Sequence, residues 1–266
     1  MTDDTVPDFA RVVPPAGSRI AIVGGAGGIG QAVVAACRAL RLKTAVLDLE
    51  ASLKRNPAAD DVLAVPVDVT KEETVKAGFE EVDRNWGGLD VLVFLAGIAV
   101  IPPRLIEELT PSQWDNVMQV NLRSAWFCVR GALPLLRKSG GGSIVTVSSS
   151  LAYNPNRGFS AYVSTKGGLV SFTKAIAAEN GPNIRANVVA PSAVDTAFLA
   201  GGADRAEAGG SDDWFKQGVA GYVANIPLGR LAVPDDVVGP ILFLAGPGAK
   251  YMTGQVIHVN GGRITP

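Results

Sequence analysis

Short apolar segments alternate with longer helical stretches along almost the whole chain, and this alternation constrains the fold most. Segments rich in Val and Ile and bounded by Gly, Asp or Asn are typical of buried strands. Strands that are joined through helices form parallel sheets with helices on both faces. The predicted strands cover residues 19–23, 44–47, 62–67, 89–95, 143–148, 184–189 and 255–259, and the predicted helices cover residues 29–42, 71–85, 111–138, 160–179 and 234–244. We therefore predict an α/β fold with a seven-stranded parallel sheet flanked by helices on both faces.

The chain is expected to form one domain after a short extension. Its 266 residues are enough for one large α/β domain or two small ones. No internal repeat or linker divides the chain, so we assign residues 1–18 to an acidic, proline-bearing extension and residues 19–266 to a single domain. Residues 196–225 are rich in Gly, Ala and Asp and are predicted to form a substrate loop.

Composition excludes several classes of function. Hydrophobic residues make up 47% of the chain and charged residues 18%, which is typical of an ordered globular core. The formal net charge of −1 gives no electrostatic case for a nucleic acid or an anionic membrane as partner. No apolar run approaches the roughly 20 residues that span a bilayer. The default expectation is a cytoplasmic protein.

Few residues are available for metal binding or for hydrolase chemistry. The two cysteines, Cys37 and Cys128, both fall in apolar helical patterns, where a buried thiol is the ordinary interpretation. The single histidine, His258, has no cysteine cluster beside it, so a zinc site is not predicted. One histidine without a G-x-S-x-G motif also argues against a Ser-His-Asp hydrolase.

A glycine-rich turn joins the first predicted strand to the first helix. Gly24, Gly28 and Gly30 permit a tight turn and a close approach of the backbone to a pyrophosphate at the helix N-terminus. Asp48 ends the second strand, twenty residues after Gly28, where a carboxylate can accept both ribose hydroxyls and repel a 2′-phosphate. No Arg or Lys lies in the turn or at positions 49–53, so NAD is favoured over NADP. The alternative is that Asp48 only caps the strand end.

Tyr162 and Lys166 are separated by one helical turn and therefore lie on one helix face. An ammonium near a phenol favours the phenolate and lowers the pKa of the phenol, which makes a tyrosine usable as a general acid or base. Such a pair also arises by chance on solvated helix faces. The interpretation as a reactive pair is supported by three other features of the chain: the glycine turn, Ser149 thirteen residues upstream of Tyr162, and Asn121.

Taken in this order, these motifs resemble those of the short-chain dehydrogenase/reductase family, from about Arg19 to Gly262. The family's GxxxGxG motif corresponds to the glycine turn and its YxxxK motif to Tyr162 and Lys166; the tail KYMTGQVIHVNGG resembles the family's C-terminal segment. The resemblance implies a single-domain Rossmann fold and a homotetramer. It also implies hydride transfer between NAD(H) and a small-molecule secondary alcohol or ketone.

The resemblance also implies a role for each residue of the site. Tyr162 would exchange a proton with the substrate oxygen, and Lys166 would lower the tyrosine pKa and bind the nicotinamide ribose. Ser149, rather than its serine neighbours, would hydrogen-bond the substrate oxygen. Asn121 would position a water in the proton relay. The alternative for Asn121 is a buried amide satisfied by backbone groups.

Further cofactor contacts follow from the same resemblance. Asp68 and Val69 match the adenine-contacting pair after the third strand, although Asp68 alone would be interpreted as a helix N-cap. Val194 and Thr196 match the carboxamide contacts after the sixth strand, and a plain loop is the alternative there. The remaining positions expected at the cofactor are Ile29, Ala96 and Gly97.

Three positions depart from the family pattern. Val23 stands where the family usually has Thr before the first glycine, and Phe94-Leu95 replace the two Asn after the fourth strand. These two changes can be coupled, because replacing both partners of a hydrogen bond leaves no orphan polar group. Ser192 replaces the Gly of the family's Pro-Gly pair and can reshape the loop near the nicotinamide. Weaker cofactor binding remains open.

Two rival functions remain. One is an NADPH-dependent carbonyl reductase, including a 3-oxoacyl reductase; the other is a non-catalytic nucleotide-binding scaffold of the same fold. Aromatic residues in the 196–225 loop suggest an apolar or ring-bearing substrate, or else they pin the loop to the body: Phe198, Trp214, Phe215 and Tyr222. The sequence names neither the substrate nor its stereochemistry nor the direction of reaction.

Overall fold

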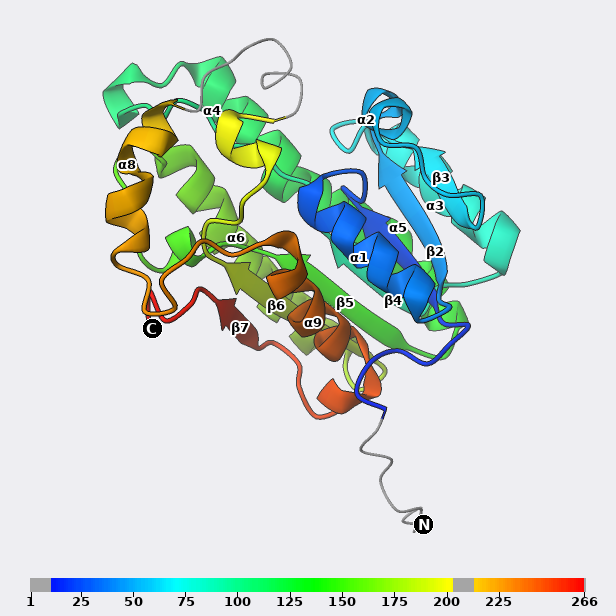
Figure 1. Cartoon of the computed structure of the whole chain (residues 1–266). Helices are drawn as coiled ribbons and strands as arrows, with labels where there is room; N and C mark the ends of the chain where they lie inside the picture. The colour runs from blue at the N-terminus through cyan, green and yellow to red at the C-terminus, as the bar shows by residue number, and fades with distance from the viewer. Residues whose placement is uncertain (1–10, 203–212, 266) are drawn as a thin grey trace.

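Seven parallel strands form one sheet in the computed structural model, which describes residues 11–202 and 213–265. The strand order is β3-β2-β1-β4-β5-β6-β7, and every neighbouring pair is parallel (Figure 1). The strands are β1 (Arg19–Val23), β2 (Lys43–Asp48), β3 (Val62–Pro66), β4 (Val91–Phe94), β5 (Gly142–Val147), β6 (Ile184–Pro191) and β7 (Val256–Val259). The predicted single-domain Rossmann-type α/β fold is confirmed.

Helices connect the strands and cover both faces of the sheet. The α-helices are α1 (Gly28–Ala39), α2 (Glu50–Arg55), α3 (Glu72–Trp86), α4 (Pro111–Met118), α5 (Ser124–Lys138), α6 (Ser160–Asn180), α8 (Asp213–Val223) and α9 (Pro234–Ala245). Shorter helical turns are η1 (Ile106–Glu108), η2 (Gln119–Arg123), η3 (Ser150–Ala152), η4 (Ala197–Ala200) and η5 (Pro247–Ala249). Within the part of the chain described here, no helix combines the length and apolar character needed to cross a membrane.

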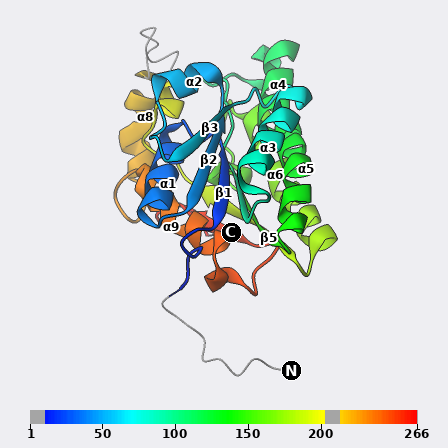
Figure 2. The same ribbon diagram turned by 90° about the vertical axis from the view of Figure 1, so that its right-hand side faces the viewer.

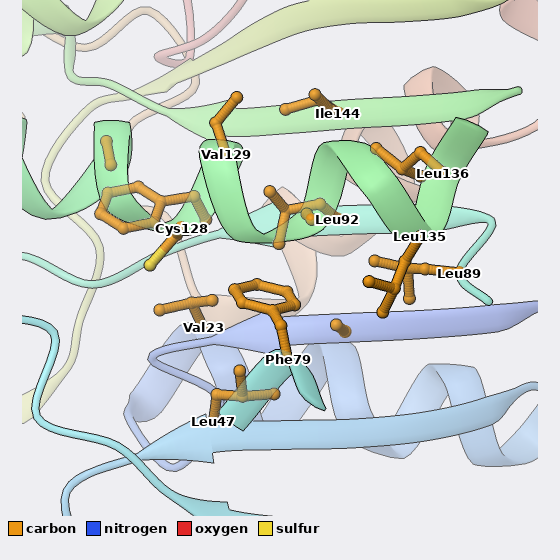
Figure 3. Packing of buried hydrophobic residues seen from close by; sticks show 14 of the residues in the cluster. Val23, Leu47, Phe79, Leu89, Leu92, Cys128, Val129, Leu135, Leu136 and Ile144 are labelled. Atoms are coloured by element: carbon orange, nitrogen blue, oxygen red, sulfur yellow. The ribbon is translucent and has the colours of Figure 1, made fainter. Parts of the chain in front are cut away.

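Two hydrophobic clusters hold the layers together, one on each face of the sheet. α3, α5 and α6 pack on one face, and α1 and α9 pack on the other (Figure 2). On the first face, the ring of Phe79 lies among aliphatic side chains of the central strands and of α5 (Figure 3). Burial of these apolar side chains is the main source of stability for such a layered fold.

The two cysteines belong to opposite clusters. Cys37 on α1 and Cys128 on α5 are both completely buried and make no disulfide. Burial raises the pKa of the Cys37 thiol to about 12, and it also raises the pKa of the Cys128 thiol. Both thiols are therefore packing groups, as their apolar sequence context predicts.

The structure corrects the predicted elements in three places. The predicted helix over 111–138 is α4 and α5 joined by the π-helical turn η2. The short helix α2 was not predicted; Leu53 anchors it to a small cluster. The predicted substrate loop over 196–225 contains η4 and α8 rather than loop alone. Its residues 203–212 and the side chains of Trp214 and Phe215 lie outside the described part of the chain.

The order of the strands determines where a ligand can bind. The chain runs outward from β1 through β2 to β3, and then returns to β4 on the other side of β1. In open α/β sheets, ligands bind at the carboxyl ends of the strands where this reversal occurs. β1 and β4 mark that point, and the glycine turn directly follows β1.

Candidate active site

A cleft of about 960 Å³ lies at the carboxyl ends of the central strands. It is lined by segments that follow strands β1 to β6, together with part of α6 and Tyr222 from α8. The predicted site residues that line it are Gly24, Gly28, Ile29, Gly30, Asp48, Val69, Ala96, Gly97, Ser149, Tyr162, Lys166, Val194 and Thr196. The structure therefore brings thirteen separately predicted positions into one cavity.

The glycine turn is packed too closely for side chains. Gly24 has φ +82°, and a Cβ on it would lie 2.7 Å from the backbone nitrogen of Ala96. A Cβ on Gly30 would lie 2.4 Å from the carbonyl oxygen of Gly24. α1 begins here without a side-chain cap and without an acid in its first turn. An uncapped helix N-terminus behind a tight glycine turn fits the pyrophosphate of a dinucleotide.

Asp48 contacts the glycine turn and also borders the cleft. Its carboxylate accepts hydrogen bonds from the backbone N–H groups of Ala26, at 2.9 Å, and Leu49, at 2.8 Å. It therefore stabilises the turn, as the strand-cap alternative requires, and it also lines the cleft. Arg55 also lines the cavity, so a cation and a carboxylate both border the cleft.

Asp68 and Val69 differ in their position relative to the cleft. Val69 lines the cavity, whereas Asp68 is absent from its lining. The Asp68 carboxylate accepts hydrogen bonds from the backbone N–H and the hydroxyl of Thr70, at 3.0 and 2.7 Å. Burial tends to raise the pKa of Asp68, but these hydrogen bonds and the nearby Lys71 ammonium lower it overall. Asp68 therefore shapes its own loop, and it is not the N-cap of α3, which is Lys71.

Tyr162 and Lys166 extend from α6 into the cleft, so they do not form a solvated helix face. Lys166 is only 4% exposed, and its Nζ lies 5.6 Å from the centroid of the Tyr162 ring. The Lys166 ammonium donates a hydrogen bond to the carbonyl oxygen of Val147 at 2.9 Å. Burial lowers the pKa of Lys166 to about 8.

The tyrosine pKa moves in the direction opposite to the expected one. Burial raises the pKa of Tyr162 to about 12, although a hydrogen bond with Ser149 opposes this rise. This direction differs from the expected one because burial is the dominant influence on both groups. At neutral pH the phenol therefore holds its proton.

Three consecutive serines after β5 have different surroundings. The Ser148 hydroxyl donates to the carbonyl oxygen of Lys166 at 2.7 Å. The Ser149 hydroxyl accepts from the N–H of Leu151 at 3.1 Å and is the serine that interacts with Tyr162. The buried Ser150 hydroxyl has no hydrogen-bond partner. Ser149 is thus the serine that the structure places at the phenol.

Asn121 lies in the π-helical turn η2 and is completely buried. Its Oδ1 accepts from the N–H of Ile98 at 2.7 Å, and its Nδ2 donates to the carbonyl oxygen of Ile98 at 2.9 Å and to the hydroxyl of Thr165 at 3.0 Å. Both amide N–H groups are engaged, and Asn121 does not line the cleft. This arrangement matches the alternative of a buried amide satisfied by its surroundings.

The departures at Val23 and Phe94 face each other across two strands. They are register partners in the β1–β4 pair, and both side chains are completely buried in one hydrophobic cluster. The N–H of Leu95 donates to the carbonyl oxygen of Val23 at 2.8 Å, so backbone pairing continues up to the cleft. The two apolar replacements leave no unpaired polar side chain between these strands.

Two phenylalanines of the cleft lie beside Tyr162; Phe198 belongs to the loop aromatics named from the sequence, whereas Phe159 was not predicted. The ring centroids of Phe159 and Phe198 lie 6.3 and 5.9 Å from that of Tyr162, so two phenylalanines flank the phenol. Phe159 precedes Tyr162 by three residues, which is a helical spacing that could have revealed it. Asn156 and Tyr222 also line the cavity; Tyr222 was one of the loop aromatics named from the sequence, whereas Asn156 gave no signal.

The glycine turn at the N-terminus of α1 and the Ser149–Tyr162–Lys166 set in the same cleft define a nicotinamide-dependent oxidoreductase. A family model described as Enoyl-(Acyl carrier protein) reductase matches residues 24–263. The chain belongs to the short-chain dehydrogenase/reductase family, as its motifs predict.

Curated relatives and solved structures agree with this assignment. The 3-oxoacyl-[acyl-carrier-protein] reductase FabG of Aquifex aeolicus is 35% identical over 199 residues, which are 74% of this chain and 75% of the relative. A FabG of Staphylococcus aureus is 35% identical over 203 residues, 76% of this chain and 77% of the relative.

A Brucella melitensis structure titled short-chain dehydrogenase/reductase SDR:Glucose/ribitol dehydrogenase has a TM-score of 0.84 at 26% identity, covering 96% of this chain and 99% of that one. A 3-ketoacyl-(acyl-carrier-protein) reductase of Brucella melitensis, complexed with NADH, has a TM-score of 0.82 at 30% identity and covers 93% and 98% of the two chains.

Proposed function

We propose that this oxidoreductase interconverts a secondary alcohol and a ketone with NAD(H), at Tyr162. The observation that carries the proposal is the meeting of Ser149, Tyr162 and Lys166 in the same cleft as the glycine turn and Asp48. When bound, the nicotinamide supplies or accepts the hydride. The protein would hold the dinucleotide with the glycine turn, Asp48, Val69, Ala96, Gly97, Val194 and Thr196.

The side chains of the site would then handle the proton. Tyr162 is protonated at neutral pH and can donate a proton to the oxygen of a ketone. Ser149, the partner of the phenol, would hold the same oxygen. Phe159 and Phe198 flank the phenol with apolar surface, which limits the access of water and suits an apolar or ring-bearing substrate.

The choice of NAD rests on the Asp48 carboxylate, which would repel a 2′-phosphate. The rival is an NADPH-dependent carbonyl or 3-oxoacyl reductase. Two observations favour this rival: the curated relatives are named 3-oxoacyl-[acyl-carrier-protein] reductases, and Arg55 lines the cleft. Asp48 accepts a hydrogen bond from Ala26 of the glycine turn, which fixes its carboxylate beside the proposed dinucleotide site. We therefore retain NAD as the proposed cofactor.

Assembly and location form part of the same proposal. We propose a homotetramer in which the surface of α4, α5 and α6 forms one interface and the C-terminal segment forms another. Trp126 on α5 is 43% exposed, as expected for a side chain that a second subunit would cover. The near-zero net charge and the absence of a spanning helix among the described residues accord with a cytoplasmic enzyme.

A cofactor comparison with matched tyrosine variants tests the proposal. Purified protein would be assayed for NADH and NADPH oxidation with cyclic and open-chain ketones and with a 3-oxoacyl thioester. Tyr162→Phe should reduce turnover by about 10²–10⁴-fold, whereas Tyr251→Phe, at a fully exposed position, should leave it unchanged. Full activity of Tyr162→Phe would refute the role of Tyr162. Preference for NADPH with the thioester would establish the rival.

A further inference from the structure

Tyr222 connects α8 to the loop that follows β6. Its hydroxyl lies 2.8 Å from the Ser192 hydroxyl, and it accepts a hydrogen bond from the backbone N–H of Ala193 at 3.2 Å. These partners are about thirty residues apart in the sequence. A single phenol therefore holds the helix to two neighbouring positions of the loop.

The donors and acceptors of this contact form a consistent chain. Because the Ala193 N–H donates to the phenol oxygen, the phenol proton is available for the Ser192 hydroxyl. A glycine at position 192, as in the usual family pattern, has no group that can take part. The departure at Ser192 thus creates a contact that the usual sequence lacks.

Arg263 from the C-terminal segment makes a second contact with the same tyrosine. Its guanidinium carbon lies 4.4 Å from the centroid of the Tyr222 ring, and its Nη2 donates a long hydrogen bond, 3.4 Å, to Oδ1 of Asn156. Cations stack favourably on aromatic faces at this distance. Figure 1 shows α8 and the C-terminal segment at the same end of the molecule. The ring of Tyr222 is therefore oriented independently of its hydroxyl.

The residues of this contact line the same cleft as Tyr162. Ser192, Tyr222 and Asn156 all line the cavity. Phe198, on the segment between Ser192 and α8, packs beside the Tyr162 ring. The position of α8 relative to the loop therefore affects the walls that would surround a substrate at Tyr162.

We propose that the hydroxyl pair of Ser192 and Tyr222 holds α8 against the substrate end of the cleft, which makes both residues positioning residues for substrate retention. The substrate part of this inference rests on the proposed function, whereas the contact itself does not. The partner of the site is the same small alcohol or ketone that reacts at Tyr162.

Hydrogen–deuterium exchange of residues 213–226 tests the contact without any substrate. Tyr222→Phe and Ser192→Ala each remove one oxygen, and Tyr222→Phe keeps the ring on Arg263. Ser192→Ala loses one hydrogen bond and Tyr222→Phe loses two, and each variant should speed exchange of this segment by about 2- to 10-fold or more. The double variant should exchange no faster than Tyr222→Phe alone, because Tyr222→Phe already removes the bond to Ser192 together with the bond from the Ala193 N–H. Tyr251→Phe serves as the matched control and should exchange as the wild type does.

Steady-state kinetics test the positioning role. Both single variants should raise KM for the carbonyl substrate by about 2- to 10-fold while kcat stays within about 2-fold. Unchanged exchange, or additive effects in the double variant, would overturn the proposal. Faster exchange with an unchanged KM would also overturn it, since the contact would then be structural only. Absence of turnover in the wild type, with the exchange effect intact, would count against the proposed function and leave the contact established.

Discussion

Replacing Lys166 by methionine should stabilise the protein at neutral pH while it removes a group of the proposed site. Lys166 is almost completely buried, and burial lowers the pKa of its ammonium from 10.5 to about 8. The folded state therefore buries a charge below pH 8 that the unfolded chain exposes to water. Methionine has a similar length and no charge, so Lys166→Met removes this cost.

The expected gain follows from the pKa and from one hydrogen bond. The lowering from 10.5 to about 8 corresponds to about 3 kcal/mol of destabilisation below pH 8. The variant loses the hydrogen bond to the Val147 carbonyl, which costs about 1–2 kcal/mol. A net gain of about 1–2 kcal/mol remains, which raises Tm by about 2–6 °C for a chain of this size.

The pH dependence of this gain has a defined sign. Between about pH 8 and 10.5 the unfolded chain binds a proton that the folded wild type does not, so wild-type stability rises with pH in that window. The variant lacks the group, and its advantage should therefore shrink between pH 8 and 10.5.

Thermal unfolding of the protein without cofactor, followed by circular dichroism at pH 7 and pH 10, measures both effects. Lys174→Met, on the exposed face of the same helix, is the matched control and should change Tm little at either pH. The reasoning is refuted if Lys166→Met is less stable than the wild type at pH 7. An equal Tm difference at both pH values would also refute it.

Three other outcomes are expected. Gly30→Ala should weaken NADH binding by at least about 10-fold, because its Cβ would lie 2.4 Å from the Gly24 oxygen; Gly167→Ala, with open space around it, should bind as the wild type does in the same fluorescence titration. Asp48→Ser should lower the ratio of kcat/KM for NADH over NADPH by at least about 10-fold; an unchanged ratio would contradict the assigned role of this carboxylate. Val23→Thr should lower the free energy of unfolding by about 1–3 kcal/mol in urea, because the new hydroxyl would face buried apolar groups; a neutral result would show that a partner for it exists.

The strands could be predicted because each buried strand is a short run of apolar residues, which can be recognised from the local sequence alone. The run at 89–95 contains β4, observed at Val91–Phe94, and the other runs match their strands equally closely. The sequence did not reveal α2, since its six residues carry no periodic apolar face. The π-helical turn η2 was also missed, because one extra residue in a helical ladder leaves the apolar pattern almost unchanged.

The candidate site divides along similar lines. The glycine turn, Asp48 and the Tyr162–Lys166 pair depend on spacing within or directly after one element, and such spacing can be predicted. The hydrogen bonds of Asn121 and the contact of Ser192 with Tyr222 join segments 23 to 44 residues apart. Contacts of this kind depend on how the layers pack, which local patterns do not encode.

The burial of both cysteines gives the protein a surface without native thiols. Reagents that label cysteine react with the thiolate, and neither Cys37 nor Cys128 is exposed or readily ionised at neutral pH. Ala220→Cys, at an exposed position of α8, would therefore accept a single spin label or fluorophore without prior removal of any native residue. Because both native thiols are buried in the core, a label attached to α8 would report on that helix alone.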